Sequence, residues 1–359
     1  MKKYLFIIIS IHLIFSGYFL QINLYCQEIA SNPNTNQLNG KVDIDVTVAP
    51  ELFPVIQKLL SEGNTKYIEY SLVNWSINNQ SNDTVQITLT SDIPEWTTPV
   101  ISNIHLAPNE NKKVVQNPFG KKLLTEDHST IPTTIILTAK TPERTIYEET
   151  KNVKIRPADD MIWSMRYPYD MCELIAAWVT PNDQKVESIL AEAKERMFDN
   201  NLSGYRGDVI AQLKAIFNTV RNHKVSYVDS QMSFGEVGTT QRVRLPSESL
   251  MQKSANCIDG AVLFASLFEN IGLESVIVII PWHAFVGVRT APNSDEIWFI
   301  ETTLVGRNIL NSIVNLQTTF QAAIDAGAKN YMEAMQSDSK SVYIIDIKKA
   351  RQEGIYPLW

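Results

Sequence analysis

The sequence is short of cysteine, of histidine and of runs of positive charge. Only three cysteines occur in 359 residues, and after the N-terminal segment only Cys172 and Cys257 remain. Two cysteines in separate segments do not make a disulfide framework, so we expect free thiols. The 32 basic side chains are outnumbered by 39 acidic ones and form no block that follows a phosphate backbone. We therefore expect no nucleic acid partner.

The N-terminal segment has the order of a secretory signal. Two lysines precede an apolar run from Tyr4 to about Leu20, and polar residues follow it. We expect residues 1–26 to be a signal peptide, with an uncleaved membrane anchor as the alternative because the run approaches the length that crosses a bilayer. Lipidation of Cys26 is a further alternative, although Tyr25 before it is bulky. The protein is thus predicted to be exported, to the periplasm or the extracellular space.

Two domains follow, which differ in the spacing of their apolar residues. Residues 27–41 are rich in Asn, Pro, Gln and Gly and have no apolar period, which is typical of a linker. Residues 42–157 contain short alternating runs separated by turn residues, namely "VDIDVTVAP", "YIEYSLVNWSI", "DTVQITLTS" and "TTIILTAKTP". This alternation predicts an all-β, immunoglobulin-like sandwich of about seven strands. The sandwich or the N-terminal segment would associate the protein with the cell envelope.

Helical spacing of apolar residues begins after residue 157. The runs "TPNDQKVESILAEAKERM" and "DVIAQLKAIFNTV" predict two amphipathic helices ahead of Cys257. The later runs "SVIVIIP", "HAFVGVRT", "EIWFIETT" and "SVYIIDI" predict strands, with a hairpin turn around Asn293 and Ser294. Helices followed by strands indicate that residues 158–359 form an α+β domain.

Cys257 opens a third predicted helix. Asn256 precedes it, and an apolar run continues to Gly272, which is a standard helix stop. A helix N-terminus supplies partial positive charge and amide donors that favour a thiolate. A cysteine that serves packing alone would lie deeper in the apolar run, whereas Cys172 is expected to be buried. Cys257 is therefore the candidate nucleophile.

A nucleophilic cysteine needs a base that later returns the proton, and a third group that orients this base. His283 opens one predicted strand of the hairpin, and Glu301 follows the end of the next strand. In a hairpin these two ends lie side by side, so Cys257, His283 and Glu301 are predicted to form a triad. The Cys257 amide and the Gln241 side chain are candidate donors to an oxyanion.

Two other classes of function compete with this prediction. The domain is alternatively a catalytically silent binding module whose working surface is the sandwich. A zinc site made of Cys257, His283, Glu301 and Asp259 is a third candidate, but no two of these residues have the short spacing of structural zinc ligands. We expect neither a metal nor a cofactor.

The chain resembles the transglutaminase-like superfamily in three segments, "NCIDGAVLFASLFENIGLESVIVI", "HAFVGV" and "WFIETT". The resemblance extends back to the segment "IFNTVRNHKVSYV". It covers about residues 180–303 and implies a papain-like transglutaminase core. It also implies that Cys257 is the nucleophile, His283 the general base and acid, and Glu301 the orienting carboxylate. The family more often has Asp-Pro-Thr where this chain has Glu-Thr-Thr. The implied function is a peptidase or amidase that acts on a protein or peptide through a thioester, with a protein-crosslinking transglutaminase as the alternative.

Overall fold

The computed structural model describes residues 42–358 apart from 126, 230–232, 307 and 312–313, and the side chains of 307–317 are not described. The predicted signal peptide or anchor, Cys26 and the linker 27–41 lie outside the described residues. Within the part of the chain that is described, no helix has the length and apolar character needed to cross a membrane. The chain has helices together with several separate sheets, which agrees with the predicted α+β class.

Two compact units divide the chain. The first comprises the residues up to Ser61, Tyr67–Leu123 and Thr130–Arg156, and the second comprises Glu62–Lys66, Leu124–Ser129 and Pro157–Trp359. The two short segments belong to the second unit through polar contacts. Asn64 Nδ2 donates to the carbonyl of Glu353 at 2.9 Å, and His128 Nδ1 lies 2.8 Å from Asp159 Oδ2.

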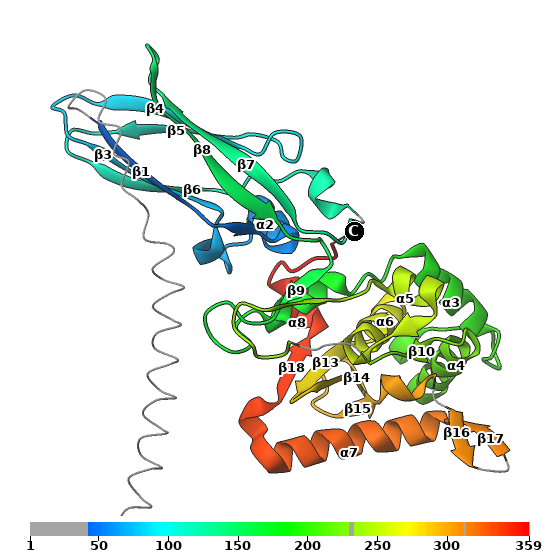
Figure 1. Ribbon diagram of the computed structural model, residues 1–359. Coiled ribbons are helices and arrows are strands. Elements are labelled where there is room, and N and C mark those ends of the chain that lie inside the picture. Colours follow the sequence, from blue (N-terminus) through cyan, green and yellow to red (C-terminus); the bar gives the residue numbers. More distant parts are fainter. Residues whose placement is uncertain (1–41, 126, 230–232, 307, 312–313, 359) are drawn as a thin grey trace, which may run out of the picture. The chain divides into compact units, whose positions relative to one another are not determined.

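The first unit contains two sheets around one core (Figure 1). One sheet has the order β1 (Val42–Val48), β3 (Val73–Asn79), β6 (Asn111–Gln116), and the other has the order β2 (Glu51–Leu52), β8 (Thr145–Ile155), β7 (Ile131–Lys140), β4 (Val85–Asp92), β5 (Val100–Leu106). Buried and exposed residues alternate along β3 and β4, as the sequence predicts for strands with one wet face. Trp75 is buried in this core and donates from Nε1 to Gln116 at 3.0 Å.

Local structure in this unit differs from expectation at two places. Ile68–Tyr70 forms a 3₁₀ turn, η1, although the run "YIEYSLVNWSI" was expected to be extended from its start. The helix α2 (Pro54–Ser61) was not predicted. Its length of 8 residues is too short to establish a helical period in the sequence against the surrounding alternation.

The second unit is built around a four-stranded antiparallel sheet with the order β15 (Ile297–Ile300), β14 (His283–Arg289), β13 (Ser275–Ile280), β18 (Tyr343–Asp346). Shorter pairs are β9 (Asp160–Ile162) with β11 (Thr240–Arg242), β10 (Ser226–Tyr227) with β12 (Ser254–Ala255), and β16 (Asn308–Asn311) with β17 (Val314–Gln317). Its helices are α3 (Gln184–Lys194), α4 (Val209–Asn222), α5 (Pro246–Gln252), α6 (Cys257–Asn270), α7 (Phe320–Asp338) and α8 (Ile347–Gln352). Its 3₁₀ turns are η3 (Cys172–Trp178), η4 (Gly204–Arg206), η5 (Thr302–Leu304) and η6 (Ser339–Ser341).

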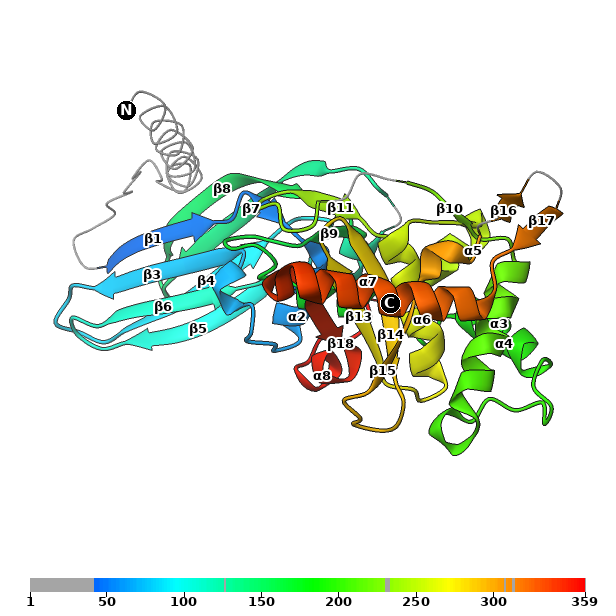
Figure 2. The same cartoon turned by 90° about the horizontal axis from the view of Figure 1, so that it is seen from below.

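Two helices cover this sheet. The helix α6 packs against β13 and β14, and all its residues from Cys257 to Phe268 are buried. On the other side α7 runs along β15 (Figures 1 and 2), where Tyr331 stacks on Phe299 with ring centroids 4.3 Å apart. The sheet is therefore apolar on both faces, which explains the nearly continuous apolar run of β13.

Candidate active site

The first turn of α6 fixes the position of Cys257. Asn256 is the N-cap, and its side chain accepts from the amide of Asp259 at 2.9 Å, while Asp259 Oδ2 accepts from the amide of Asn256 at 3.0 Å. Asp259 is fully buried and also binds Arg244 through the Arg244 amide and guanidinium, both at 2.8 Å. This reciprocal cap holds the cysteine at the first helical position, as the sequence predicts.

The chain that leads into α6 is held by a parallel strand pair. β12 pairs with β10, so that Tyr227 lies opposite Ala255, and the amide of Val228 donates to the carbonyl of Ala255 at 3.0 Å. Lys253, just before β12, has a φ of 53°, which lies in the left-handed region and turns the chain sharply out of α5. Ala255 is thus buried and strand-paired, and Asn256, which follows it, is buried as the N-cap of α6.

His283 and Glu301 meet at one end of the hairpin. Because β14 and β15 are antiparallel and Val286 pairs with Ile300, the start of β14 lies beside the end of β15. His283 Nε2 lies 2.6 Å from Glu301 Oε2, and the His283 ring is also hydrogen-bonded to the side chain of Cys257. With Nε2 engaged by the carboxylate, Nδ1 is the ring nitrogen that remains for the thiol. The three residues predicted from the sequence therefore lie together.

The electrostatics of the site favour a charged imidazole. Burial alone would lower the pKa of His283, but the hydrogen bonds and charges of Cys257 and Glu301 outweigh it and raise the pKa to about 10. Burial likewise opposes ionisation of Glu301, yet His283 and Thr303 hold the pKa of this carboxyl below its ordinary value. At neutral pH the site therefore contains a histidinium beside an ionised carboxylate. A neighbouring histidinium and a helix N-terminus are settings that favour a thiolate.

Glu301 is 4% exposed, and both of its oxygens are occupied. Oε1 accepts from the amide of Thr303 at 3.0 Å and from its hydroxyl at 2.7 Å. Oε2 accepts from His283 and from Asn330 Nδ2, the latter at 2.8 Å. The second threonine of Glu-Thr-Thr thus donates two hydrogen bonds to the carboxylate.

Sequence reasoning missed Asn330 because the helix α7 was not predicted. The available signal was Thr319, an N-cap residue, followed by small or apolar residues at helical spacing at Phe320, Ala323, Gly327 and Tyr331. That pattern locates the helix, but it does not indicate which strand the helix covers.

Cys172 and Gln241 have different settings from the triad. Cys172 lies in η3 and is half-buried, so the prediction that it is buried is wrong. Partial burial and, to a lesser extent, Glu173 raise the pKa of its thiol to about 12. Gln241 is buried in β11, and its Oε1 accepts from Trp163 Nε1 and from the amide of Ser233, both at 3.2 Å. Within the described residues the Gln241 amide nitrogen has no partner.

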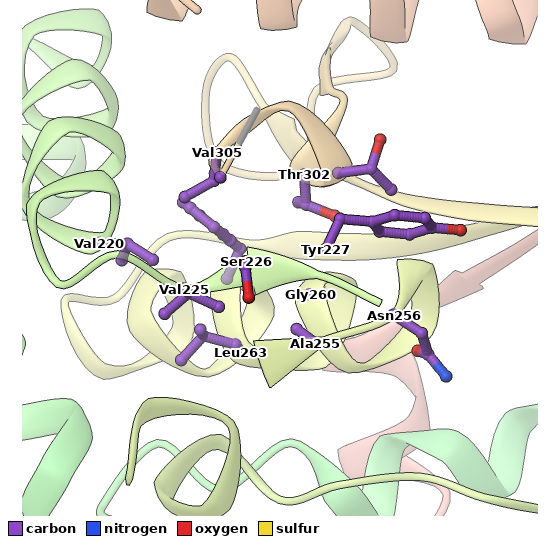
Figure 3. Close-up of a pocket in the computed structure, with 13 residues that line it drawn as sticks. Val220, Val225, Ser226, Tyr227, Ala255, Asn256, Gly260, Leu263, Thr302 and Val305 are labelled. Atoms are coloured by element: carbon purple, nitrogen blue, oxygen red, sulfur yellow. The ribbon is translucent and has the colours of Figure 1, made fainter. Parts of the chain in front are cut away.

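A small recess lies along α6, beside residues that adjoin Cys257 and Glu301 in the sequence (Figure 3). It is lined by Asn256, which precedes Cys257, by Gly260 and Leu263 of α6, and by Thr302 and Thr303, which follow Glu301. The lining is mainly apolar, and Thr302 Oγ1 has no hydrogen-bond partner in the described part of the chain.

The residues that the structure describes contain no group of three or more His, Cys, Asp or Glu side chains arranged to hold a metal ion. Asp259, the fourth residue of the zinc alternative, is engaged by Arg244 and Asn256. Hydrogen bonds link Cys257 to His283 and His283 to Glu301.

Comparison with known proteins assigns no family. No protein-family model matches the chain, and no curated protein matches it. Among solved structures, a FixG-related protein from Vibrio parahaemolyticus is 7% identical with a TM-score of 0.21, covering 33% of this chain and 98% of that one. A β-glucosidase from Listeria innocua in complex with gluconolactone is 14% identical with a TM-score of 0.20, covering 32% of this chain and 16% of that one. Similarities of this size carry no argument about fold or function.

Proposed function

We propose that the protein is an exported cysteine-dependent acyl-transfer enzyme, with a papain-like, transglutaminase-like core preceded by a β-sandwich domain. In this proposal it hydrolyses an amide bond of a protein or peptide. The observation that carries the proposal is the single imidazole of His283, hydrogen-bonded to the thiol of Cys257 and to Glu301 Oε2 at 2.6 Å.

The proposed reaction has two steps. The Cys257 thiolate attacks the amide carbonyl carbon, and the histidinium of His283 gives its proton to the leaving nitrogen as the carbon–nitrogen bond breaks, which leaves a thioester. Water then attacks the thioester while His283 accepts one of its protons. Collapse of that intermediate releases a carboxylic acid, which loses its proton to water, and restores the thiolate and the histidinium. Glu301 stays ionised throughout and holds the imidazole in place.

The surroundings of Cys257 suit this chemistry. Its own amide lies at the helix N-terminus and is a natural donor to the oxyanion. The buried Gln241 amide nitrogen is the candidate for a second donor.

The proposal is tested with a digest of whole-cell proteins as a mixed peptide substrate in H₂¹⁸O. We expect the wild-type protein to generate peptides with a new carboxylate that carries one ¹⁸O atom, detected by mass spectrometry. Cys257→Ala should generate none, and Cys172→Ala should behave as wild type. Products joined through a lysine amine, without ¹⁸O, would assign protein crosslinking instead. An unchanged digest, despite a well-folded protein, would favour the silent binding module.

A further inference from the structure

The carboxylate of Glu301 has a partner that lies far from the triad in the sequence. Asn330, on α7, donates from Nδ2 to Glu301 Oε2 at 2.8 Å, the same oxygen that His283 Nε2 contacts at 2.6 Å. Both donors thus converge on one atom. A donor to an ionised oxygen makes one of the stronger hydrogen bonds in proteins, and it restricts the orientation of the carboxylate.

The helix α7 is built to bring Asn330 to this oxygen. Ala323, Gly327 and Asn330 follow one another at helical spacing on the face toward β15. A Cβ at Gly327 would lie 2.7 Å from the backbone carbon and oxygen of Phe299, so only glycine allows this approach of helix and strand. The carbonyl of Ala323 accepts from the amide of Glu301 at 3.0 Å. The backbone of α7 is therefore hydrogen-bonded to the backbone of Glu301, one turn before Gly327. Asn330 contacts the side chain of the same glutamate.

A glutamate needs such anchoring. Its side chain has one more rotatable bond than aspartate, so more conformational freedom is lost when the carboxylate is fixed. Thr303 holds Oε1 through two hydrogen bonds, of 3.0 and 2.7 Å, but these leave the carboxylate free to tilt at Oε2. Asn330 adds a restraint on Oε2 from α7, beside the contact of His283 with the same oxygen.

We propose that Asn330 is a positioning residue of the triad, which acts on Cys257 through Glu301 and His283. It touches neither the thiol nor the imidazole in the described hydrogen bonds. Its role rests on the proposed function, because a carboxylate that positions an imidazole matters only if the imidazole serves the cysteine. Without Asn330 the carboxylate tilts, the histidinium is held less firmly, and it stabilises a thiolate less.

The test uses purified Asn330→Ala and Asn330→Asp. Alanine removes the donor and is a good helix former, while aspartate keeps the shape and replaces the donor with a second carboxylate. Asn270→Ala is the matched control, since it removes an amide that donates at 2.7 Å to the carbonyl of Pro181 at the far end of α6. The ring pKa of His283 is followed by NMR in protein labelled with ¹⁵N-histidine, and the alkylation rate of Cys257 by iodoacetamide is followed by mass spectrometry.

We expect Asn330→Ala to lower the pKa of His283 toward its ordinary value. The rate of Cys257 alkylation at pH 6 should fall about tenfold for each unit by which the pKa of His283 is lowered. Asn330→Asp should also slow alkylation, because its carboxylate repels and displaces that of Glu301, but its negative charge should keep the pKa of His283 higher than in Asn330→Ala. Asn270→Ala should change neither quantity.

Two outcomes would overturn the inference. In the first, Asn330→Ala leaves both the pKa of His283 and the alkylation rate unchanged while wild-type Cys257 reacts rapidly. In the second, Asn270→Ala and Asn330→Ala lose the same amount, which assigns the effect to general stability. Failure of the proposed function looks different: wild-type Cys257 is then unreactive, although Asn330→Ala still lowers the pKa of His283.

Discussion

His283 Nε2 lies 2.6 Å from Glu301 Oε2, at the end of a hairpin where β14 begins and β15 has just ended. The antiparallel register that pairs Val286 with Ile300 produces this proximity, because residues beyond either strand end fall on the same edge of the sheet. The charged imidazole follows from this contact together with the neighbouring Cys257.

Replacing Glu301 with glutamine keeps the shape of the side chain and removes its charge. The pKa of His283 should fall from about 10 toward 6.5, because the carboxylate no longer stabilises the charged ring. Turnover of the peptides that wild-type protein hydrolyses should fall on the order of 10²-fold or more, as expected when the group that orients a catalytic histidine is lost. Glu296→Gln, an exposed change near the hairpin turn, should leave both unchanged. Equal activity of the two variants would remove Glu301 from the triad.

The pH dependence of stability follows from the two shifted groups. His283 has a raised pKa, so its stabilising contribution is fully present below pH 6.5 and is lost as the pH rises through about 10. Glu301 has a lowered pKa, so its contribution is present above pH 4.5 and is lost as the pH falls through the folded-state value. The difference in urea midpoint between wild type and His283→Gln should therefore be largest between pH 4.5 and 6.5. A difference that grows toward pH 10 would contradict the assigned charges.

Two adjacent threonines should respond in opposite ways to valine. Thr302 Oγ1 is buried without a partner among the described residues, so Thr302→Val should raise the free energy of unfolding by about 1 kcal/mol. Thr303 Oγ1 donates to Glu301 at 2.7 Å, so Thr303→Val should lower stability by about 1–3 kcal/mol and slow alkylation of Cys257. Denaturant unfolding of the two variants provides the comparison. A loss of stability in Thr302→Val would mean that its hydroxyl has a partner.

Several parts of this arrangement were predictable from the sequence, because their signals are local. Asn256, the apolar run to Gly272 and the hairpin turn residues identify α6, β14 and β15, and hairpin pairing brings His283 to Glu301. Asn330 was not predictable in this way. Its partner is 29 residues away, and no local pattern states that α7 covers β15.

The two short segments that belong to the second unit were likewise not predictable from local patterns in the sequence. Residues 62–66 and 124–129 lie within the stretch predicted to be all-β, yet they belong to the second unit. Lys66 forms ion pairs with Glu173 and Glu353, which are far along the chain, and His128 pairs with Asp159. Such contacts depend on the folded arrangement, whereas alternation of apolar residues reports only the strand in which they occur.

The close approach of α7 and β15 makes a further prediction at Gly327. Glycine in the middle of a helix costs about 1 kcal/mol relative to alanine, so Gly327→Ala should stabilise an isolated helix. In the protein the new Cβ would lie 2.7–2.8 Å from three backbone atoms of Phe299 and Ile300, which cannot move like a flexible side chain. We expect a lower melting temperature and slower alkylation of Cys257, because α7 is pushed away and Asn330 with it. Ala326→Gly, at a partly exposed position of the same helix, is the control for propensity alone.

The central claim is that Cys257 is an activated nucleophile, and the most direct measurement is its alkylation rate relative to that of Cys172 in the same folded protein. Iodoacetamide at pH 7, with mass spectrometry of the two cysteine peptides over time, gives both rates at once. The thiol of Cys172, with a pKa of about 12, serves as the internal reference. Cys257 is the more buried of the two cysteines, so a higher rate there reports activation and not exposure. The account predicts that Cys257 reacts about 10²-fold faster or more, and that His283→Ala removes this difference. Equal rates at the two cysteines, or labelling of Cys257 only after unfolding, would contradict it.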